Sequence, residues 1–586
     1  MTPQHMETIK SLAASYPTPG AAVLGGLQVL QGARGGYLTD DDLTDVAAAL
    51  RVPLSTVEAT CSYYSMLRRT PVGKYHLQLD TNLPALLAGA DALLDHLQRA
   101  LGIQVGETTK DGLFTLSTVE DLGSCGTCPV LQVNDRYYEN LTPAKVDQLL
   151  ASLRKGVLPD ARPEGHFGSE CNILLARRGK GDPGLAGYVK DGGYQGLAKA
   201  LAQPPADVQK AVKDAMLRGR GGAGFPAGLK WGFIPKDNAK PVYLICNADE
   251  GEPGTFKDRQ IMEHDPHLLL EGMAIAGYAI GARLGYVYIR GEFAWIADLL
   301  ERAVAEARKA GKLGPDAHGK GVGFDVRVVR GAGAYVCGEE TALIESLEGK
   351  RGNPRLRPPY PAVSGLFGCP TIVNNVETLA CVPYILREGV EAFRKIGTPN
   401  NFGPKIFGVS GHVNRPGTYE FPLGTPLAKV LEAAGGVKGH LKAIIVGGLS
   451  VPILTAAESA SLVMDYDSCI KAGTMLGSGG IMVMNDTVSL PRMALRAIRF
   501  YAHESCGQCT PCRQGSLVIE QLLHRVVEGH GRSADLDHIL SLCSTIKGST
   551  LCPTGDAFAM PIEAMIKKFR PEFERLCAEG GPHADR

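Results

Sequence analysis

Between residues 200 and 403 the chain alternates short apolar runs with longer segments of helical period. Three runs typical of buried strands lie at 242–246, 284–289 and 324–329. Helices are expected between these runs, at 268–282 and 294–310. Strands that alternate with helices are typical of a parallel sheet, so this part of the chain predicts an α/β domain.

The pattern of apolar positions differs on either side of this domain. Caps and helical spacing mark the beginning of the chain, and an alternating strand that starts at Lys74 opens a mixed α/β unit. Short strands separated by turns follow the α/β domain, and the end of the chain is helical. In order, we expect a helical region (1–70), a mixed α/β unit (71–155), a Pro- and Gly-rich linker (156–199), the α/β domain (200–403), a small β-rich domain (404–490) and a helical domain (491–586).

Composition narrows the possible functions. The 586 residues contain 61 basic and 61 acidic side chains, so no overall charge favours nucleic acid or an anionic membrane. The most apolar long segment is interrupted by Glu271 and Arg283, which predicts no membrane span. No secretory signal is visible at the N-terminus. The 15 cysteines, many of them isolated, suit a reducing cytoplasm better than a disulfide scaffold.

Four cysteines near the C-terminus have the spacing of a metal centre. Cys506, Cys509 and Cys512 form a Cys-x-x-Cys-x-x-Cys run, and Cys552 follows downstream. Three close thiolates and one distant thiolate meet the requirement of a [4Fe–4S] cluster. Zinc is the rival, although structural zinc sites favour two separated Cys-x-x-Cys pairs. Unrelated buried thiols are the remaining alternative, and the spacing favours a protein that carries electrons.

A glycine-rich loop precedes the first predicted strand of the α/β domain. Gly219, Gly221, Gly222 and Gly224 let the main chain approach a ligand closely, and Lys230 adds a positive charge. The loop matches neither the dinucleotide fingerprint nor the P-loop. On its own it fits a tight structural turn as well as a nucleotide site.

Two further loops follow predicted strands. The first contains four polar or acidic residues and the second combines glycine, an aromatic ring and paired carboxylates. Ligands of open α/β sheets bind at the carboxyl ends of strands, where both loops begin. The alternative for the first loop is a solvated acidic turn. The residues concerned are Asn247, Asp249, Glu250 and Glu252 in the first loop, and Tyr335, Gly338, Glu339 and Glu340 in the second.

Together these motifs carry a family resemblance. The three loops, the segment Pro358–Ala362 and the segment Thr371–Thr378 resemble the flavin-binding, NADH-oxidising subunit of respiratory complex I, and the similarity continues through the four cysteines to about residue 570. The first 155 residues resemble the complex I subunit that holds a [2Fe–2S] cluster on a thioredoxin-like domain. Such a fusion resembles the flavin subunit of soluble NAD-reducing [NiFe] hydrogenases, with a β-grasp-like domain at 404–490.

The resemblance implies the positions of FMN and NADH. NADH would stack on the flavin with its adenine side near Phe225 and Phe233, and Glu252 and Glu340 would position the nucleotide rather than act as acid or base. Arg357 and Tyr360 stand where the family often has Lys and Phe, which keeps the charge and the ring. The expected FMN residues are Gly219, Arg220, Gly221, Gly222, Lys230, Asn247, Asp249, Glu252, Tyr335, Gly338, Glu339, Asn374, Asn375 and Thr378.

The thioredoxin-like unit departs from the family at its cluster positions. The family places four cysteines where this chain has Asp80, Ala85, Asp121 and Cys125. One thiol of four remains, so we expect a domain without a [2Fe–2S] cluster. The alternatives are thiol redox chemistry at Cys125 and Cys128, or a rearranged site that uses Cys61.

The same resemblance implies the partners. A converter with one cluster has to pass electrons to another protein, so a ferredoxin-like iron–sulfur subunit and [NiFe] hydrogenase subunits are expected in a cytoplasmic complex. Alternatives are the corresponding subunit of complex I or of an NAD-dependent formate dehydrogenase. A non-catalytic iron–sulfur scaffold is the alternative of another class.

Overall fold

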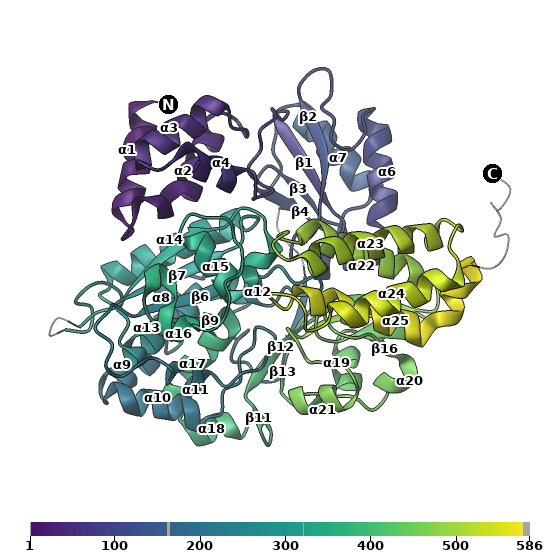
Figure 1. Ribbon diagram of the computed structural model, residues 1–586. Helices are drawn as coiled ribbons and strands as arrows, with labels where there is room; N and C mark the ends of the chain where they lie inside the picture. The colour runs from purple at the N-terminus through teal and green to yellow at the C-terminus, as the bar shows by residue number, and fades with distance from the viewer. Residues whose placement is uncertain (1, 161–164, 320–321, 578–586) are drawn as a thin grey trace.

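The computed structural model describes residues 2–160, 165–319 and 322–577 and has the α/β multidomain architecture expected from the sequence (Figure 1). The chain begins with four helices joined by short turns: α1 (Pro3–Ala14), α2 (Val23–Ala33), α3 (Asp40–Leu50) and α4 (Leu54–Cys61). A capping box begins α3, because the Thr39 hydroxyl accepts from the backbone N–H of Asp42 and the Asp42 carboxylate accepts from that of Thr39.

The thioredoxin-like unit has a four-stranded sheet with the order β2-β1-β3-β4. Strands β1 and β2 are parallel, and β3 and β4 continue the sheet antiparallel. Leu77, Leu116 and Leu150 lie in a hydrophobic core of its own. Its elements are β1 (Tyr75–Asp80), α5 (Leu83–Leu87), α6 (Ala90–Leu101), β2 (Phe114–Val119), β3 (Leu131–Val133), β4 (Arg136–Tyr138) and α7 (Pro143–Arg154).

The central domain is built on a fully parallel sheet with the order β8-β7-β6-β9. Its strands are β6 (Tyr243–Ala248), β7 (Leu284–Ile289), β8 (Asp325–Arg330) and β9 (Thr371–Asn375). The helices of the domain are α9 (Gln195–Leu201), α10 (Pro205–Asp214), α11 (Ala227–Trp231), α12 (Asp258–His264), α13 (Pro266–Ile280), α14 (Ala294–Lys309), α15 (Glu340–Leu347), α16 (Pro361–Ser364), α17 (Val376–Glu388) and α18 (Val390–Arg394). The alternating strands and helices predicted between 242 and 329 are therefore confirmed.

Both faces of the central sheet are covered. Leu244 and Cys246 of β6 lie in the hydrophobic cluster that contains α13, α14 and α17. The intervening residue, Ile245, lies in the cluster of the N-terminal helices together with Leu27 and Val57. Because side chains alternate along a strand, the N-terminal helices pack on the face opposite to α13.

The prediction that residues 156–199 form an independent linker is wrong. Strand β5 (His166–Ser169) pairs in parallel with β13 (Gly417–Pro422), and helix α8 (Leu185–Lys190) lies on the central domain. The Glu420 carboxylate accepts from the backbone N–H groups of residues 173, 174 and 175. Pro and Gly here shape a packed segment, and the prediction failed because its partner strand is distant in sequence.

The small β-rich domain has a six-stranded sheet with the order β16-β15-β18-β12-β13-β5. Strand β5, which precedes the central domain in sequence, forms one edge of this sheet. Its elements are β12 (Pro404–Gly411), β13, β14 (Thr425–Pro426), α19 (Leu427–Ala433), β15 (Leu441–Ile445), β16 (Leu454–Thr455), α20 (Ala456–Ser459), β17 (Val463–Met464), α21 (Tyr466–Lys471) and β18 (Gly480–Asn485). A two-stranded ribbon, β10 (Gly397–Thr398) and β11 (Asn401–Phe402), precedes it.

Four helices form the C-terminal domain: α22 (Leu490–Glu504), α23 (Thr510–Val527), α24 (Ser533–Ile546) and α25 (Thr554–Cys577). Ile498, Ile519, Ile539 and Ile562 contribute one residue from each helix to a shared core. In Figure 1 these helices lie beside the thioredoxin-like unit and the β-rich domain. Within the described ranges, no helix combines the length and the hydropathy needed to cross a membrane.

Candidate functional site

The three candidate loops meet at the carboxyl edge of the central sheet. The loop after β6 contacts the loop after β8, because the Asn247 side-chain amide donates to the Gly338 carbonyl at 2.8 Å. The glycine-loop region joins them through Lys230, whose Nζ lies 2.7 Å from the Glu340 carboxylate. Convergence at the strand ends is the arrangement expected of a ligand site in a parallel sheet.

The glycine loop lies against the end of β9 and the start of α17. The Arg220 backbone N–H donates to Thr378 Oγ1 at 2.8 Å. A Cβ added to Gly221 would come within 3.1 Å of the Asn375 side chain, and Gly222 has a φ of +145° with open space beside it. Glycine is therefore favoured at both positions, by close approach at Gly221 and by backbone conformation at Gly222.

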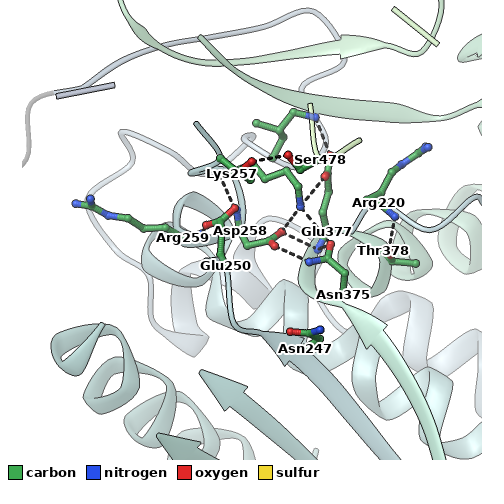
Figure 2. A network of polar contacts seen from close by, with 12 residues as sticks. Arg220, Asn247, Glu250, Lys257, Asp258, Arg259, Asn375, Glu377, Thr378 and Ser478 are labelled. Atoms are coloured by element: carbon green, nitrogen blue, oxygen red, sulfur yellow. Dashed lines mark hydrogen bonds and ion pairs between the residues drawn. The ribbon is translucent and has the colours of Figure 1, made fainter. Parts of the chain in front are cut away.

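The Arg220 side chain leads away from this loop. Its guanidinium donates to the Phe402 carbonyl at 2.7 Å, in the ribbon before the β-rich domain, and the residue is 0% exposed. Figure 2 shows the side chain pointing away from Asn375 and Asn247, while its backbone N–H bonds to Thr378. This geometry offers a flavin the Arg220 main chain rather than its charge.

A buried network of charges supports the same edge of the sheet (Figure 2). Lys257 Nζ lies 2.6 Å from Asp258 and 3.0 Å from Glu377, and Lys405 Nζ lies 2.7 Å from Glu377. Asp258 also accepts from the Asn375 side-chain amide at 2.5 Å, which fixes the orientation of that amide. Burial lowers the pKa of Lys405 to about 8, although Glu377 opposes this shift. The network links the flavin-side residue Asn375 to the β-rich domain.

The acidic loop after β6 (residues 247–252) is held on several sides. Glu252 Oε1 accepts from the Ser450 backbone N–H and hydroxyl, both at 2.7 Å, and Oε2 accepts from the Tyr335 hydroxyl at 2.8 Å. The Glu250 carboxylate instead accepts from the backbone N–H groups of residues 257, 258 and 259. Burial raises the pKa of Asp249 well above its usual range and raises that of Glu252. Glu250 is therefore a loop-closing residue, whereas Glu252 ties the loop to Ser450 and to Tyr335.

The other predicted residues divide into supports that hold the local structure and an exposed rim. Glu339 caps α15 by accepting from the backbone N–H groups of residues 341 and 342, and the Asn374 side-chain oxygen accepts from the Trp231 indole at 2.8 Å. Phe225 and Phe233 have ring centroids 5.9 Å apart and are 47% and 55% exposed. Paired apolar rings at the entrance provide a stacking surface for a nucleobase.

The four cysteines predicted to hold a cluster gather at the end of the helical domain that faces the flavin-side loops. Cys506 and Cys509 lie in the turn between α22 and α23, Cys512 lies in the first turn of α23, and Cys552 lies just before α25. Burial raises the pKa of Cys506, and nearby Cys552 and Cys509 raise it further; the pKa of Cys512 rises to about 11 for the same reasons. As thiolates these four side chains repel one another, and a shared cationic centre would stabilise them. This set of donors therefore fits a [4Fe–4S] cluster.

The cysteine site lies directly against the loop after β8. Cys552 and Cys506 pack with Val336 and Ala342 in one small cluster. Tyr335, one residue before Val336, has its ring centroid 5.1 Å from that of Phe500 and 5.9 Å from that of Tyr501, both on α22. The predicted cluster site and the predicted flavin site are therefore adjacent, which is the arrangement that electron transfer requires.

The residues around the strand ends also fit FMN. The N-terminus of α17 and Lys230 provide positive charge for a phosphate, and Gly219, Gly221 and Gly222 provide close backbone. Asn247, Asp249 and Asn374 offer polar atoms for the ring system. Arg290, Lys257, Glu377, Lys405 and Ser450 were missed by sequence reasoning, although Arg290 directly follows β7 and the strand-end rule would have indicated it.

Comparison with protein families agrees with this architecture. Four family models match: the Nuo51 FMN-binding domain over residues 212–384, the thioredoxin-like [2Fe–2S] ferredoxin over 9–154, the SLBB domain over 406–452, and the NADH-ubiquinone oxidoreductase-F iron-sulfur binding region over 492–576. The fold and these matches define an NAD-dependent flavin iron–sulfur oxidoreductase, with FMN and a [4Fe–4S] cluster as cofactors and NADH as substrate.

Individual relatives identify the family. An F-type NADH-quinone oxidoreductase subunit of Rhizobium meliloti is 51% identical over 402 residues, which are 67% of this chain and 95% of the relative. The mitochondrial NADH dehydrogenase [ubiquinone] flavoprotein 1 of Dictyostelium discoideum is 48% identical over 421 residues, 71% of this chain and 88% of the relative. The chain belongs to the family of NADH-binding flavoprotein subunits of the complex I type.

One solved structure matches almost the entire chain. The NAD⁺-reducing [NiFe]-hydrogenase in the H₂-reduced state superposes with a TM-score of 0.85 at 34% identity, covering 95% of this chain and 92% of the hydrogenase chain. Its air-oxidised form matches with a TM-score of 0.83. The predicted resemblance, fold class and cofactors FMN and [4Fe–4S] are thus confirmed. The roles of individual site residues, and the expected lack of a [2Fe–2S] cluster, stay predictions.

Proposed function

We propose that this chain is the NADH-oxidising flavin (diaphorase) subunit of a cytoplasmic NAD-reducing [NiFe] hydrogenase. One observation carries the proposal. The hydrogenase structure matches 95% of the chain, whereas the relatives of the complex I type match 67–71% of it. A match of that extent includes the fused N-terminal units as well as the flavin and cluster domains.

The residues of the central domain bind and orient the two nucleotides. The glycine loop, Lys230 and the start of α17 hold the FMN phosphate, and Asn247, Asp249 and Asn374 face its ring. Phe225 and Phe233 stack on the adenine side of NADH. FMN held by these residues would supply the conversion between hydride transfer and single-electron transfer. Positioning is the whole task of Glu252 and Glu340, and no side chain acts as an obligatory base.

Four thiolates, from Cys506, Cys509, Cys512 and Cys552, hold the [4Fe–4S] cluster next to the loop after β8. The packing of Cys552 on Val336 and Ala342 supports this assignment, because it places the cysteine site against the loop after β8. A ferredoxin-like iron–sulfur subunit, docked beside the C-terminal helices, then passes electrons to or from the hydrogenase subunits.

Hydrogen-dependent reduction of NAD by the purified native complex is the decisive test. We expect NAD reduction under H₂, and NADH oxidation by an artificial acceptor in the isolated chain. Coupling to quinone or formate without hydrogen activity would instead assign the chain to complex I or to a formate dehydrogenase. A chain that purifies with a cluster but binds neither FMN nor NADH would be a non-catalytic scaffold.

A further inference from the structure

The four cluster positions of the thioredoxin-like unit meet around one side chain, Asn82. Its amide nitrogen donates to Asp80 Oδ2 at 3.1 Å, to Asp121 Oδ1 at 2.7 Å and to Cys125 Sγ at 3.4 Å. Its amide oxygen accepts from the Ala85 backbone N–H at 2.7 Å. All five residues are buried. The fold therefore brings the four positions together, and an amide that hydrogen-bonds to each of them lies between them.

This pocket does not fit a [2Fe–2S] cluster. Such a cluster takes four thiolate or imidazole ligands, and one thiol is present at the four positions. Burial, together with Asp121 and Asp80, raises the pKa of Cys125 well above its usual range, so its neutral thiol is favoured. Cys128 Sγ donates to the Ser124 carbonyl at 3.6 Å rather than to the Asn82 amide. The pocket is instead a polar core filled by its own hydrogen-bonded side chains.

One residue connects this core to the central domain. Arg290 Nη1 donates to Asp121 Oδ2 at 2.7 Å, and Nη2 donates to the Asp121 carbonyl at 2.7 Å. The same Nη1 donates to the Glu250 carbonyl at 2.7 Å, and Nε lies 3.1 Å from Glu292. Arg290 is 5% exposed. A single buried guanidinium thus bonds both to the Asn82-centred pocket and to the main chain of the acidic loop.

The surrounding packing leaves this contact little freedom. Gly123 has a φ of +61°, and a Cβ added there would come within 2.8 Å of the Phe293 ring and 3.0 Å of Arg290 Nη1. The Arg290 guanidinium lies 5.2 Å from the centroid of the Phe293 ring. The loop 121–125 therefore rests directly on the segment that follows β7, and any shift of Asp121 moves the guanidinium.

The other supports of the acidic loop come from other directions. Glu250 and Glu252 tie it to α12 and to Ser450 of the β-rich domain. Arg290 holds the peptide between them from the direction of the thioredoxin-like unit. We propose that Arg290 is a positioning residue, through which the Asn82-centred pocket fixes the acidic loop that engages NADH. The thioredoxin-like unit then serves nucleotide binding without carrying electrons. This inference rests on the proposed NADH site and not on the hydrogenase assignment.

The test uses the full-length, FMN-loaded chain and the variant Asp121→Asn. The Asp121 carboxylate accepts three hydrogen bonds: Oδ1 accepts from the Asn82 amide, and Oδ2 accepts from the Arg290 guanidinium and the Gly123 backbone N–H. In an asparagine, either orientation of the amide therefore points its NH₂ group at one of these donors. We expect the KM for NADH to rise about tenfold with an artificial acceptor, while kcat and FMN content stay close to wild type. Arg290→Lys, which keeps the charge but loses the forked geometry, should give a smaller rise.

Asp135→Asn is the matched control. It breaks another ion pair between the same two domains, Arg330 to Asp135 at 3.0 Å, without touching the acidic loop. We expect a wild-type KM from this variant. An Asp121→Asn chain that melts at a lower temperature but keeps the wild-type KM would overturn the inference, as would equal KM changes in both variants. A wild-type chain that binds no NADH would overturn the proposed function, and this inference with it.

Discussion

Two regions of this molecule are built on family domains that hold iron–sulfur clusters, and they differ in what fills the site. In the C-terminal domain burial raises the pKa of Cys506 and Cys512 and neighbouring cysteine thiols raise it further, so four thiolates at this place need a cationic centre to stabilise them. In the thioredoxin-like unit the corresponding space holds Asn82, which bonds to its neighbours. The four-cysteine site has thiols that suit a metal centre, whereas the polar groups of the Asn82-centred pocket bond to one another.

The comparison shows that a fold can keep the geometry of a site while its chemistry changes. Asp80, Ala85, Asp121 and Cys125 still converge, because strand β1, helix α5 and the loop after β2 determine their positions. What binds there depends on the side chains. Family membership alone therefore predicts the shape of the thioredoxin-like unit and not its cofactor.

The largest effect is expected at the four-cysteine site. Cys509→Ser removes one of four thiolates, so the [4Fe–4S] cluster should be lost or become labile while FMN stays bound. Iron and sulfide analysis with flavin absorbance would measure this. The assignment fails if the variant retains wild-type iron and sulfide.

The second prediction concerns the Asn82-centred pocket. The wild-type chain should hold about four iron atoms, those of a single [4Fe–4S] cluster, and the Cys509→Ser variant should retain no stoichiometric iron. Iron content and low-temperature paramagnetic resonance provide the measurement. A [2Fe–2S] signal that persists in the variant would contradict the prediction and point to Cys61, Cys125 and Cys128.

The third prediction concerns Lys230 and its ion pair with Glu340. Lys230→Ala removes the partner of Glu340 and the mobile positive charge of the glycine loop. We expect kcat/KM for NADH to fall about tenfold, which corresponds to about 1.4 kcal/mol, together with weaker FMN retention. Glu252→Ala should act in the same direction. Steady-state kinetics and flavin occupancy are the readouts, and wild-type values in both variants would show that the site is elsewhere.

The smallest effect is a pH dependence within the Asn82-centred pocket. Burial raises the pKa of Asp80 well above its usual range, and Asp121 adds to the shift. The folded chain then keeps a proton on Asp80 that the unfolded chain loses above about pH 4, so this carboxyl contributes less stability as the pH rises. The loss of melting temperature in Asp80→Ala should therefore be larger at pH 5 than at pH 8. A loss that grows with pH would contradict this assignment.

Much of the fold could be predicted because its signals are local. The strands of the central sheet are continuous apolar runs, and the Cys506–Cys512 spacing is compact in sequence. The convergence of Asn247 and Gly338 also followed from a general rule for the carboxyl ends of parallel strands.

The missed features all depend on contacts between distant segments. Strand β5 has no alternating apolar pattern and is defined by its pairing with β13. Asn82 follows a strand as an ordinary helix cap, and nothing local indicates that its amide joins the four cluster positions. Ser450 and Lys405 meet the central domain only through tertiary packing. Polar residues at domain junctions leave no periodic signal, which is why sequence patterns did not reveal them.

The pairing of β5 with β13 also constrains how the chain is made. Ser169 and its partner Glu420 are 251 positions apart, so at about 5–20 residues per second a ribosome needs roughly 12–50 s between them. Throughout that time the residues of β5 have no partner strand, and the N–H groups of residues 173–175 lack the carboxylate that later accepts from them. The β-rich sheet is therefore completed late in synthesis, and a nascent chain that stops before residue 417 exposes an unpaired strand to chaperones and proteases.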